Sequence, residues 1–385
     1  MTYMNLIDVC DFQGGSQPPK DKWITQYKDG YIRMLQIRDF TQKRDERDYV
    51  EVSNRIKICK KDDVLIARYG ASVGKILTGL EGAYNVAIIK SIPSKLIDKR
   101  YLYYYFNSSY FQNFLKNVGS RAAQAGFNKE DLREAKIFVP KIEHQRNIVS
   151  ILNKSKNLIE RRKNQIEQLD LLVKSKFIEM FGSENSIFEK WETVNIGAVS
   201  EVGVGVVIKP ADYYTDKENG IKTFRSLNVG EMKVKDENWV YFSKEGNEKN
   251  KKSILKKGQI LIVRSGYPGT ACVVTEEYEG CNAIDVIIAT PNNKKINSVY
   301  MCAFTNYRHG KNQILEGQAG AAQKHFNVGA YKNMKIALPP LEEQEKFELF
   351  LKQVDKLKFE MEKSLKELED NFNSLMNKAF KGELF

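Results

Sequence analysis

Two long stretches of the chain place apolar residues at alternating spacings of four and three. The first runs from Ile148 to Met180 and the second from Phe347 to Ala379, with seven and nine apolar residues at their ten positions. An average spacing of 3.5 residues puts these side chains on one helix face and is typical of a coiled coil. We expect the following residues in the helix–helix seam: Ile148, Leu152, Ile159, Ile166, Leu169, Val173, Leu351, Val354, Met361, Leu365, Leu368 and Phe372.

A different pattern precedes each long stretch. Short runs rich in β-branched and aromatic residues, such as "IRMLQI", "DVLIAR" and "NVAIIKSI", come before the first; "QILIVR", "ACVVT" and "DVIIAT" come before the second. Glycine and asparagine clusters separate the runs, as they do between strands. One helical stretch, Asp98–Asn117, interrupts the first set. Each half of the chain is therefore predicted to begin with a mixed α/β domain.

Both long helices are expected to start with the same phrase, "VPKIEHQ" and "LPPLEEQ". Pro140 and Pro339 suit the first helical turn, where no amide donor is needed. Glu143 and Glu342 favour the positive end of the helix dipole. Gly182 follows the first helix as a stop signal. The phrases lie 199 residues apart.

The repetition extends over a whole half of the chain. At the same offset "AAQAGFN" matches "AAQKHFN", and further upstream the offset falls to 196 and then to 189, as insertions in loops would cause. The duplication predicts four parts: a first domain at 1–140, a long helix at 141–182, a second domain at 183–339 and a second long helix at 340–385.

Each long helix has one apolar seam and no partner within its own half. We therefore expect the two helices to pack together as an antiparallel coiled coil, which gives the α/β (α+β) molecule a pseudo-twofold axis. Two alternatives remain. Each helix could fold back on its own domain, or it could pair with a helix of another chain.

The composition bounds the function. The chain is 42% apolar and 29% charged, which is a globular composition. Its net charge of +12 fits either a solvated basic surface without a partner or a surface that binds a polyanion, usually nucleic acid. No apolar run approaches 18 residues. Five scattered cysteines argue against a zinc site or a disulfide framework and favour the cytoplasm: Cys10, Cys59, Cys272, Cys281 and Cys302.

Two similar basic domains on a stiff spacer suit double-stranded DNA. The stretch from Ile148 to Met180 would be roughly 50 Å long as a helix. Half-sites on one face of a duplex lie about 35 Å apart. Because the two domains differ in sequence, we expect them to bind unequal half-sites of a bipartite, asymmetric DNA target.

At this point the motifs show a family resemblance. The proline–apolar–Glu–x–Gln phrase that opens two long helices, the "GQAGAAQ" stretch before the second, and the terminal "AFKGELF" resemble the specificity subunit of Type I restriction-modification enzymes. The resemblance covers the entire chain. Any one motif is short, but their duplicated order is specific.

The resemblance implies a division of labour. Each α/β domain would be a target recognition domain for one half of a split sequence, and the paired helices would set the spacer and dock two methyltransferase subunits. Restriction subunits would complete the nuclease. The specificity subunit would have no catalysis and no cofactor of its own, since S-adenosylmethionine would bind to the partner methyltransferase.

The chain does not match the catalytic motifs that its short phrases resemble. "GASVGK" has three rather than four residues between Gly70 and Gly74, and Ile76 follows Lys75 where a phosphate loop needs Ser or Thr. Neither Pro-Pro pair sits in a methyltransferase motif. The three histidines stand in unrelated contexts: His144, His309 and His325. These observations favour a binding subunit over a methyltransferase or a nuclease.

Candidate DNA contacts follow from chemistry and position. Lys and Arg suit phosphates, Arg suits guanine, and Asn or Gln suits adenine. Arg68 and Arg264 end equivalent strands just before glycine turns, from which they could reach a groove of DNA; a structural ion pair is the rival explanation. Residues kept in both halves would serve the fold or a general contact, and residues that differ would encode sequence. The candidates are Arg38, Lys43, Arg44, Arg68, Tyr69, Arg121, Gln124, Arg225, Arg264, Ser265, Tyr267, Gln323 and Lys324.

Two other binding functions stay open from the sequence. One is the specificity protein of another restriction class, with a combined methylase-nuclease partner. The other is a coiled-coil scaffold that binds only proteins, which would leave the basic charge and the paired α/β domains without a purpose.

Overall fold

The structure, a computed structural model, describes residues 2–42, 45–119, 126–318 and 326–384. It divides into two compact units. Unit 1 comprises Met1–Asn164 and Lys363–Phe385, and unit 2 comprises Gln165–Glu362. Each of the two longest helices therefore gives one part to each unit.

Unit 1 contains a two-stranded ribbon and two four-stranded sheets, with strand orders β1-β10, β2-β9-β6-β7 and β4-β3-β8-β5. Its strands are β1 (Thr2–Asn5), β2 (Cys10–Gly14), β3 (Tyr31–Leu35), β4 (Tyr49–Glu51), β5 (Ile58–Cys59), β6 (Leu65–Ala67), β7 (Ile76–Leu77), β8 (Gly82–Tyr84), β9 (Ile88–Pro93) and β10 (Lys136–Val139). Its helices are α1 (Leu6–Val9), α2 (Ile37–Thr41), α3 (Lys99–Asn107), α4 (Ser109–Gly119), the first part of α5 (Ile142–Phe181) and the last part of α12 (Leu341–Phe380).

Unit 2 repeats this plan, with strand orders β11-β20, β12-β19-β16-β17 and β13-β15-β14-β18. Its strands are β11 (Thr193–Asn195), β12 (Ser200–Val204), β13 (Tyr214–Thr215), β14 (Ile221–Phe224), β15 (Val240–Phe242), β16 (Ile260–Val263), β17 (Ala271–Val273), β18 (Asn282–Ala283), β19 (Val286–Pro291) and β20 (Lys335–Ala337). Its helices are the last part of α5 (Ile142–Phe181), α6 (Ile187–Lys190), α7 (Ile196–Val199), α8 (Lys244–Lys249), α9 (Ser298–Asn306), α10 (Arg308–Gln318), α11 (Val328–Asn333) and the first part of α12 (Leu341–Phe380).

The predicted duplication is confirmed strand by strand. In each unit one four-stranded sheet is wholly antiparallel, β2-β9-β6-β7 or β12-β19-β16-β17. The other four-stranded sheet has one parallel pair, which is the central pair β3–β8 in unit 1 and the edge pair β14–β18 in unit 2. The units differ at one edge, because β5 pairs with β8 in unit 1 whereas β13 pairs with β15 in unit 2. The strands predicted from the short apolar runs are all present as strands.

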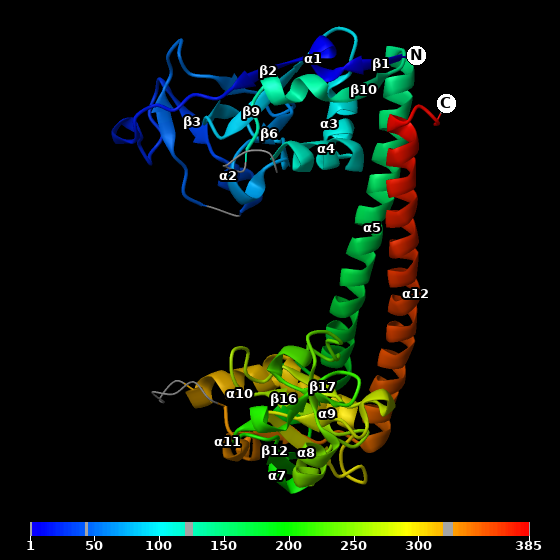
Figure 1. The fold of residues 1–385 in the computed structure, drawn as a ribbon. Helices are drawn as coiled ribbons and strands as arrows, with labels where there is room; N and C mark the ends of the chain where they lie inside the picture. Colours follow the sequence, from blue (N-terminus) through cyan, green and yellow to red (C-terminus); the bar gives the residue numbers. More distant parts are fainter. Residues whose placement is uncertain (1, 43–44, 120–125, 319–325, 385) are drawn as a thin grey trace. The chain divides into compact units, whose positions relative to one another are not determined.

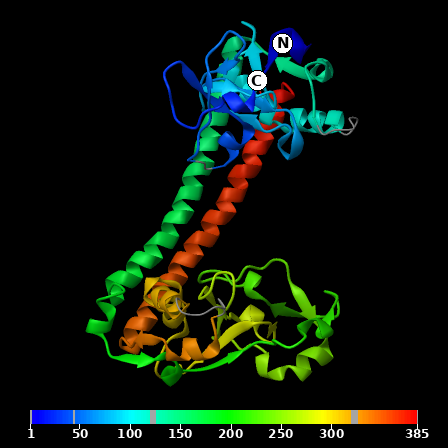
Figure 2. The same cartoon turned by 90° about the vertical axis from the view of Figure 1, so that its left-hand side faces the viewer.

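In unit 1 the parts of α5 and α12 lie side by side and run in opposite directions (Figures 1 and 2). Near the unit boundary Lys163 Nζ pairs with Glu369 Oε1 at 2.7 Å. Earlier in α5, Leu152 shares a buried core with Met376, which comes later in α12. Chain order therefore reverses between the two helices, as predicted.

The same reversal holds inside unit 2. Asp170 Oδ1 accepts a hydrogen bond from Lys358 Nζ at 2.5 Å, whereas Phe177, further along α5, contacts Phe347, nearer the start of α12, with ring centroids 5.3 Å apart. The side chain of Lys358 is 14% exposed although it occupies a seam position. The ion pair explains how a lysine is accommodated there.

The residues of the predicted seam are all at least half-buried. Six of its members are buried and six are half-buried. Buried are Ile148, Leu152, Ile159, Leu169, Val173 and Val354; half-buried are Ile166, Leu351, Met361, Leu365, Leu368 and Phe372. Near the end of α5, however, the buried positions continue at a spacing of four to Phe177, which the 3.5-residue pattern did not select. The reason is that α5 packs there against its unit's domain as well as against α12.

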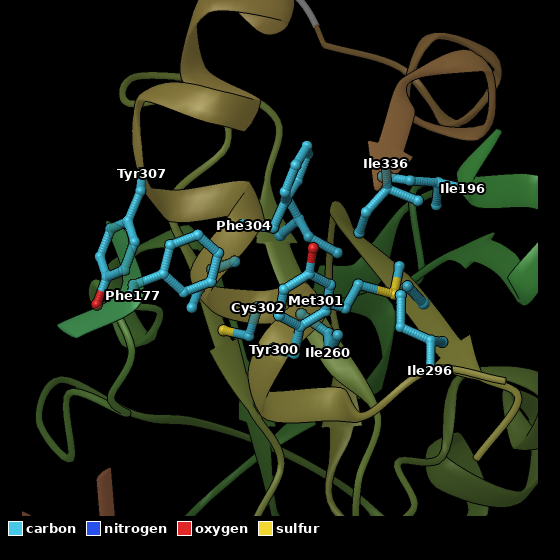
Figure 3. Close-up of a cluster of buried hydrophobic side chains, with 14 of the residues drawn as sticks. Phe177, Ile196, Ile260, Ile296, Tyr300, Met301, Cys302, Phe304, Tyr307 and Ile336 are labelled. Carbon is cyan, nitrogen blue, oxygen red and sulfur yellow. The ribbon is translucent and has the colours of Figure 1, made fainter. Parts of the chain in front are cut away.

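Figure 3 shows what Phe177 packs against in unit 2. Its ring stacks on Tyr300 of α9, with centroids 5.6 Å apart, and meets Tyr307 edge-on at 5.2 Å. Around these rings lie Ile260 of β16 and Ile336 of β20, both fully buried. Burial of this much apolar surface fixes the helix to the domain.

One expected helix is two. The stretch predicted as continuous over Asp98–Asn117 forms α3 and α4, with a break at Ser108. The Ser108 hydroxyl donates to the carbonyl oxygen of Tyr105 at 2.6 Å, and the Ser108 amide donates to the same oxygen. Such local bonds compete with continuation of the helix.

The phrase that opens α5 has a structural purpose centred on Gln145, which is fully buried. Its Oε1 accepts from the amide of Asp98 at 2.8 Å, and Asp98 is the N-cap of α3. Its Nε2 donates to the carbonyl oxygens of Pro140 (2.8 Å) and Leu96 (2.9 Å). Gln145 thus joins the starts of α3 and α5.

Gln344 does the same at the start of α12. It is fully buried, its Oε1 accepts from the amide of Asn297 at 2.8 Å, and its Nε2 donates to the carbonyl oxygen of Pro339 at 2.7 Å. Asn297 is the N-cap of α9. The phrase recurs because each domain needs a glutamine at this place to orient its long helix.

Candidate nucleic-acid interface

Several turns of unit 1 converge on the segment that follows β8. The amide of Asn85 donates to the carbonyl oxygen of Leu35 at 3.1 Å, which ties this segment to the turn before α2. The amide of Arg68 donates to the carbonyl oxygen of Ala87 at 2.8 Å, which ties it to the turn after β6. We call the resulting surface the loop end of unit 1; it comprises residues 14–16, 36–41, 68–74, 85–87 and 127.

Unit 2 has the equivalent convergence after β18. The amide of Ile284 donates to the carbonyl oxygen of Phe224 at 2.8 Å, and the amide of Gly205 donates to that of Val286 at 2.9 Å. A Cβ at Gly205 would lie 2.4 Å from the carbonyl oxygen of Ala283, so only glycine permits this close approach. The loop end of unit 2 comprises residues 204–208, 225–229, 264–269, 284–286 and 326.

Arg68 and Arg264 hold the same place in the two loop ends. The Nε of Arg68 donates to the carbonyl oxygen of Phe127 at 3.2 Å, and the amide of Phe127 donates back to Arg68 at 3.3 Å. Arg264 and Phe326 exchange the same two bonds at 3.3 and 3.1 Å. Each arginine therefore clamps the segment that precedes the last strand of its domain.

The outer nitrogens of these two arginines have different surroundings. Arg264 Nη1 forms an ion pair with Asp285, whose backbone adopts the left-handed conformation with φ +47°. Arg68 lies over the ring of Tyr69, with Cζ 5.1 Å from the centroid, and within the described part of the chain no carboxylate pairs with it. The structural ion pair that was the alternative explanation thus holds for Arg264 and not for Arg68.

Glycine turns follow both arginines. Gly70 and Gly74 have φ values of +71° and +81°, and Gly266 and Gly269 have +84° and +78°. Glycine adopts this conformation without the penalty that a side chain brings. "GASVGK" is therefore the turn between β6 and β7.

A helix of each domain fastens its glycine turn. In unit 1 the Nε2 of Gln112 on α4 donates to the carbonyl oxygen of Gly74 at 2.9 Å. In unit 2 the Nζ of Lys311 on α10 donates to the carbonyl oxygen of Pro268 at 3.3 Å, and burial lowers the pKa of Lys311. The turns are thus held by the scaffold, which leaves their outward side chains free to vary.

Arg38 and Arg225 lie on equivalent turns, after β3 and after β14. Arg38 Nη2 pairs with Asp48 Oδ2 at 3.4 Å. Arg225 Nη2 donates to the carbonyl oxygen of Asn238, and its buried Nε has no partner among the described residues. Arg225 therefore has donor capacity that the described protein does not use.

Large side chains stand exposed on both loop ends. Tyr267 is 84% exposed, Ile208 80% and Leu227 62% in unit 2, and Tyr69 is 47% exposed in unit 1. Ser265, at the position equivalent to Tyr69, is half-buried. Exposed apolar and aromatic groups in such a cluster are typical of an interaction surface.

The remaining predicted contacts lie outside the described residues: Lys43, Arg44, Arg121, Gln124, Gln323 and Lys324. Asp285 was missed by the sequence analysis, because an aspartate before an apolar run carries no signal of its own. Asp285 is identified only by the position of Arg264 beside it.

Several titratable side chains lie in the cores, where burial shifts their pKa values. Burial raises the pKa of four thiols, to about 12 for Cys10 and Cys272 and about 11 for Cys59 and Cys281. Burial lowers the pKa of His309, whose Nε2 lies 2.9 Å from the carbonyl oxygen of Gly182.

Two other features are absent from the described ranges. They contain no group of three or more His, Cys, Asp or Glu side chains that could hold a metal ion. None of the described helices is long and apolar enough to cross a membrane.

Comparison with known proteins gives a consistent picture. The model of the Type I restriction modification DNA specificity domain matches residues 1–168 and 188–370. The Type I restriction enzyme MjaVIII specificity subunit of Methanocaldococcus jannaschii is 23% identical over an alignment of 354 residues, with 87% of this chain and 82% of that protein covered.

Two solved structures share the fold. A chain from a study of complex assembly and conformational transition of the type I R-M system has a TM-score of 0.67 and 17% identity, with 100% of this chain and 98% of that one covered. The Type-I restriction-modification S subunit from M. genitalium has a TM-score of 0.54 and 15% identity, with 98% and 96% covered. The repeated domains, the repeated helix starts and the family match over both halves agree: this chain belongs to the family of Type I restriction-modification DNA specificity subunits.

Proposed function

We propose that this chain is the non-catalytic DNA-recognition subunit of a Type I restriction-modification complex. In this proposal each loop end binds one half of a bipartite, asymmetric DNA sequence. Two methyltransferase subunits, which bind S-adenosylmethionine, dock on the chain, and restriction subunits join them. The complex acts in the cytoplasm.

The observation that carries the proposal is the contrast within the duplication. The bonds that build the two loop ends recur at equivalent positions, whereas their outward side chains differ, as at Tyr69 and Ser265. Such an arrangement suits one binding chemistry applied to two different sequences. The net charge of +12 supports a polyanion as ligand.

Co-expression with a partner methyltransferase, followed by single-molecule sequencing for modified adenine, tests the proposal. We expect methylation at one split, asymmetric motif with a fixed gap. Replacement of residues 1–140 by the corresponding domain of a relative should then change one half of the motif and leave the other half unchanged.

A stable complex with the methyltransferase that methylates no motif would contradict the proposal. That outcome would favour a scaffold that binds only proteins. A matched control is replacement of residues 183–339, which should alter only the other half of the motif.

A further inference from the structure

The four arginines of the two loop ends fall into two classes by their partners. Arg38 and Arg264 each form an ion pair with a carboxylate, with Asp48 and Asp285 respectively. Arg68 and Arg225 pair with no carboxylate within the residues that the structure describes. A guanidinium already neutralised by a carboxylate gains less from a phosphate or a base than one that is not.

The two arginines without a carboxylate occupy different turns. Arg68 stands after β6 in unit 1, and the equivalent position in unit 2 is the neutralised Arg264. Arg225 stands after β14 in unit 2, and the equivalent position in unit 1 is Gln36, whose Nε2 donates to Asp48 at 3.1 Å. Each loop end therefore has one arginine that pairs with no described carboxylate. At the equivalent position the other loop end has either a neutralised arginine or a glutamine.

Arg68 is held without being neutralised. The clamp to Phe127 uses its Nε, and the ring of Tyr69 lies against its guanidinium without supplying an acceptor lone pair. Among the described residues none is seen to accept from its Nη groups, which can serve as the two parallel donors that fit the O6 and N7 of guanine.

Arg225 is held through Nη2, which donates to the carbonyl oxygen of Asn238. The buried Nε has no partner within the described chain. A buried donor without an acceptor is costly, so the guanidinium is not fully satisfied by the described protein. Close by, Leu227 is exposed and offers the apolar contact that a thymine methyl group takes.

We propose that Arg68 in unit 1 and Arg225 in unit 2 are specificity-determining residues, each of which reads a base in its own half-site, and that Arg38 and Arg264 are structural. This inference rests on the proposed function, since it assigns residues to the DNA contact. Because the two residues stand on different turns, the two half-sites differ in where their arginine-read base pair lies.

The test uses the complex with its methyltransferase subunits and a duplex that carries the methylated motif, with dissociation constants measured at several salt concentrations. We expect Arg68→Gln and Arg225→Gln each to weaken binding about tenfold or more. Each should also relax the methylated motif at one position, in one half only.

Arg264→Gln is the matched control for Arg68→Gln, because it removes the same clamp bond in the other unit. Arg225→Gln introduces the residue that unit 1 carries at the equivalent place, so it should fold. Arg38→Gln is the matched control for Arg225→Gln, because Arg38 lies on the equivalent turn of unit 1 and pairs with Asp48. We expect both controls to keep the motif and to weaken binding less than the two tested variants do, and Arg38→Gln to have the smallest effect because its ion pair is exposed.

Two results would overturn the inference. The first is a control variant, Arg264→Gln or Arg38→Gln, that loses as much DNA affinity as Arg68→Gln or Arg225→Gln does. The other is a loss by Arg68→Gln and Arg225→Gln that is equal for all sequences, with no relaxed position. In either case the unaltered complex still methylates its motif, whereas failure of the proposed function would leave no motif at all.

Discussion

The loop ends of the two units share a frame and differ in their charges. Arg68 and Arg264 clamp equivalent segments with the same pair of hydrogen bonds, yet of the two only Arg264 pairs with a carboxylate of the described residues. A duplicated chain thus separates two requirements. The bonds that recur in both units maintain the fold, and the positions at which the units differ are free to adapt to different ligands.

The largest expected effect is the loss of stability when a buried side chain of α5 or α12 is truncated, and it compares how the two units hold their long helices. Phe177 and Met376 occupy equivalent positions near the ends of α5 and α12, and both are buried. Phe177→Ala should destabilise unit 2 by about 3–5 kcal/mol, because it removes ring contacts to Tyr300 and Tyr307. Met376→Ala should cost about 2–3 kcal/mol in unit 1.

Hydrogen exchange read by mass spectrometry checks this prediction, because it assigns the lost protection to a unit. We expect Phe177→Ala to accelerate exchange in residues 165–362 first, and Met376→Ala in residues 1–164 first. Equal acceleration in both units by either variant would show that the two units unfold as one.

The buried glutamines give the next largest effect. Gln145→Met should destabilise unit 1 by about 2–3 kcal/mol, because it leaves the amide of Asp98 without its acceptor. Gln344→Met should cost slightly less in unit 2, since Gln344 donates to one carbonyl oxygen where Gln145 donates to two. Urea titrations of both variants measure the difference.

Exposed neighbours provide the control for the glutamines. Glu143 and Glu342 lie two residues before Gln145 and Gln344 and are exposed. Glu143→Gln and Glu342→Gln should each change the free energy of unfolding by less than about 0.5 kcal/mol. A Gln145→Met protein as stable as the Glu143→Gln protein would refute a structural reason for the repeated phrase.

The helix–helix ion pairs should contribute less. Lys163–Glu369 in unit 1 is exposed on both sides, whereas Lys358 in unit 2 is largely covered. A double-mutant cycle on Lys163 and Glu369 should give a coupling of about 0.2–1 kcal/mol that falls with salt. The coupling energy between Asp170 and Lys358 should fall less as the salt concentration rises, because Lys358 is largely covered. The reverse order of salt sensitivity would contradict the difference in burial.

The smallest effect is a pH dependence confined to unit 2. Burial lowers the pKa of His309 below its ordinary 6.5. Below about pH 6.5 the unfolded chain therefore binds a proton that the folded chain does not, and stability falls as pH falls. His309→Gln should flatten this fall in a series of melting temperatures from pH 7.5 to 5.5. An unchanged slope would show that His309 is protonated in the fold.

The sequence alone determined the plan of the molecule. Repeated apolar spacings identified two long helices, and the 199-residue offset identified two equivalent domains, because periodicity and duplication are properties of the chain itself. The antiparallel direction of the helices followed from that duplication. The recurrence of the helix-opening phrase was also visible, but not the buried bonds of Gln145 that explain it.

The tertiary structure decided how the charges are paired. Arg68 and Arg264 look alike in sequence, since each ends a strand before a glycine turn. Only folding brings Asp285, which stands 21 residues after Arg264, against its guanidinium. The spacing of four that buries Phe177 was likewise set by the domain against which α5 packs. Contacts between distant segments depend on which surfaces meet, and no local pattern records that.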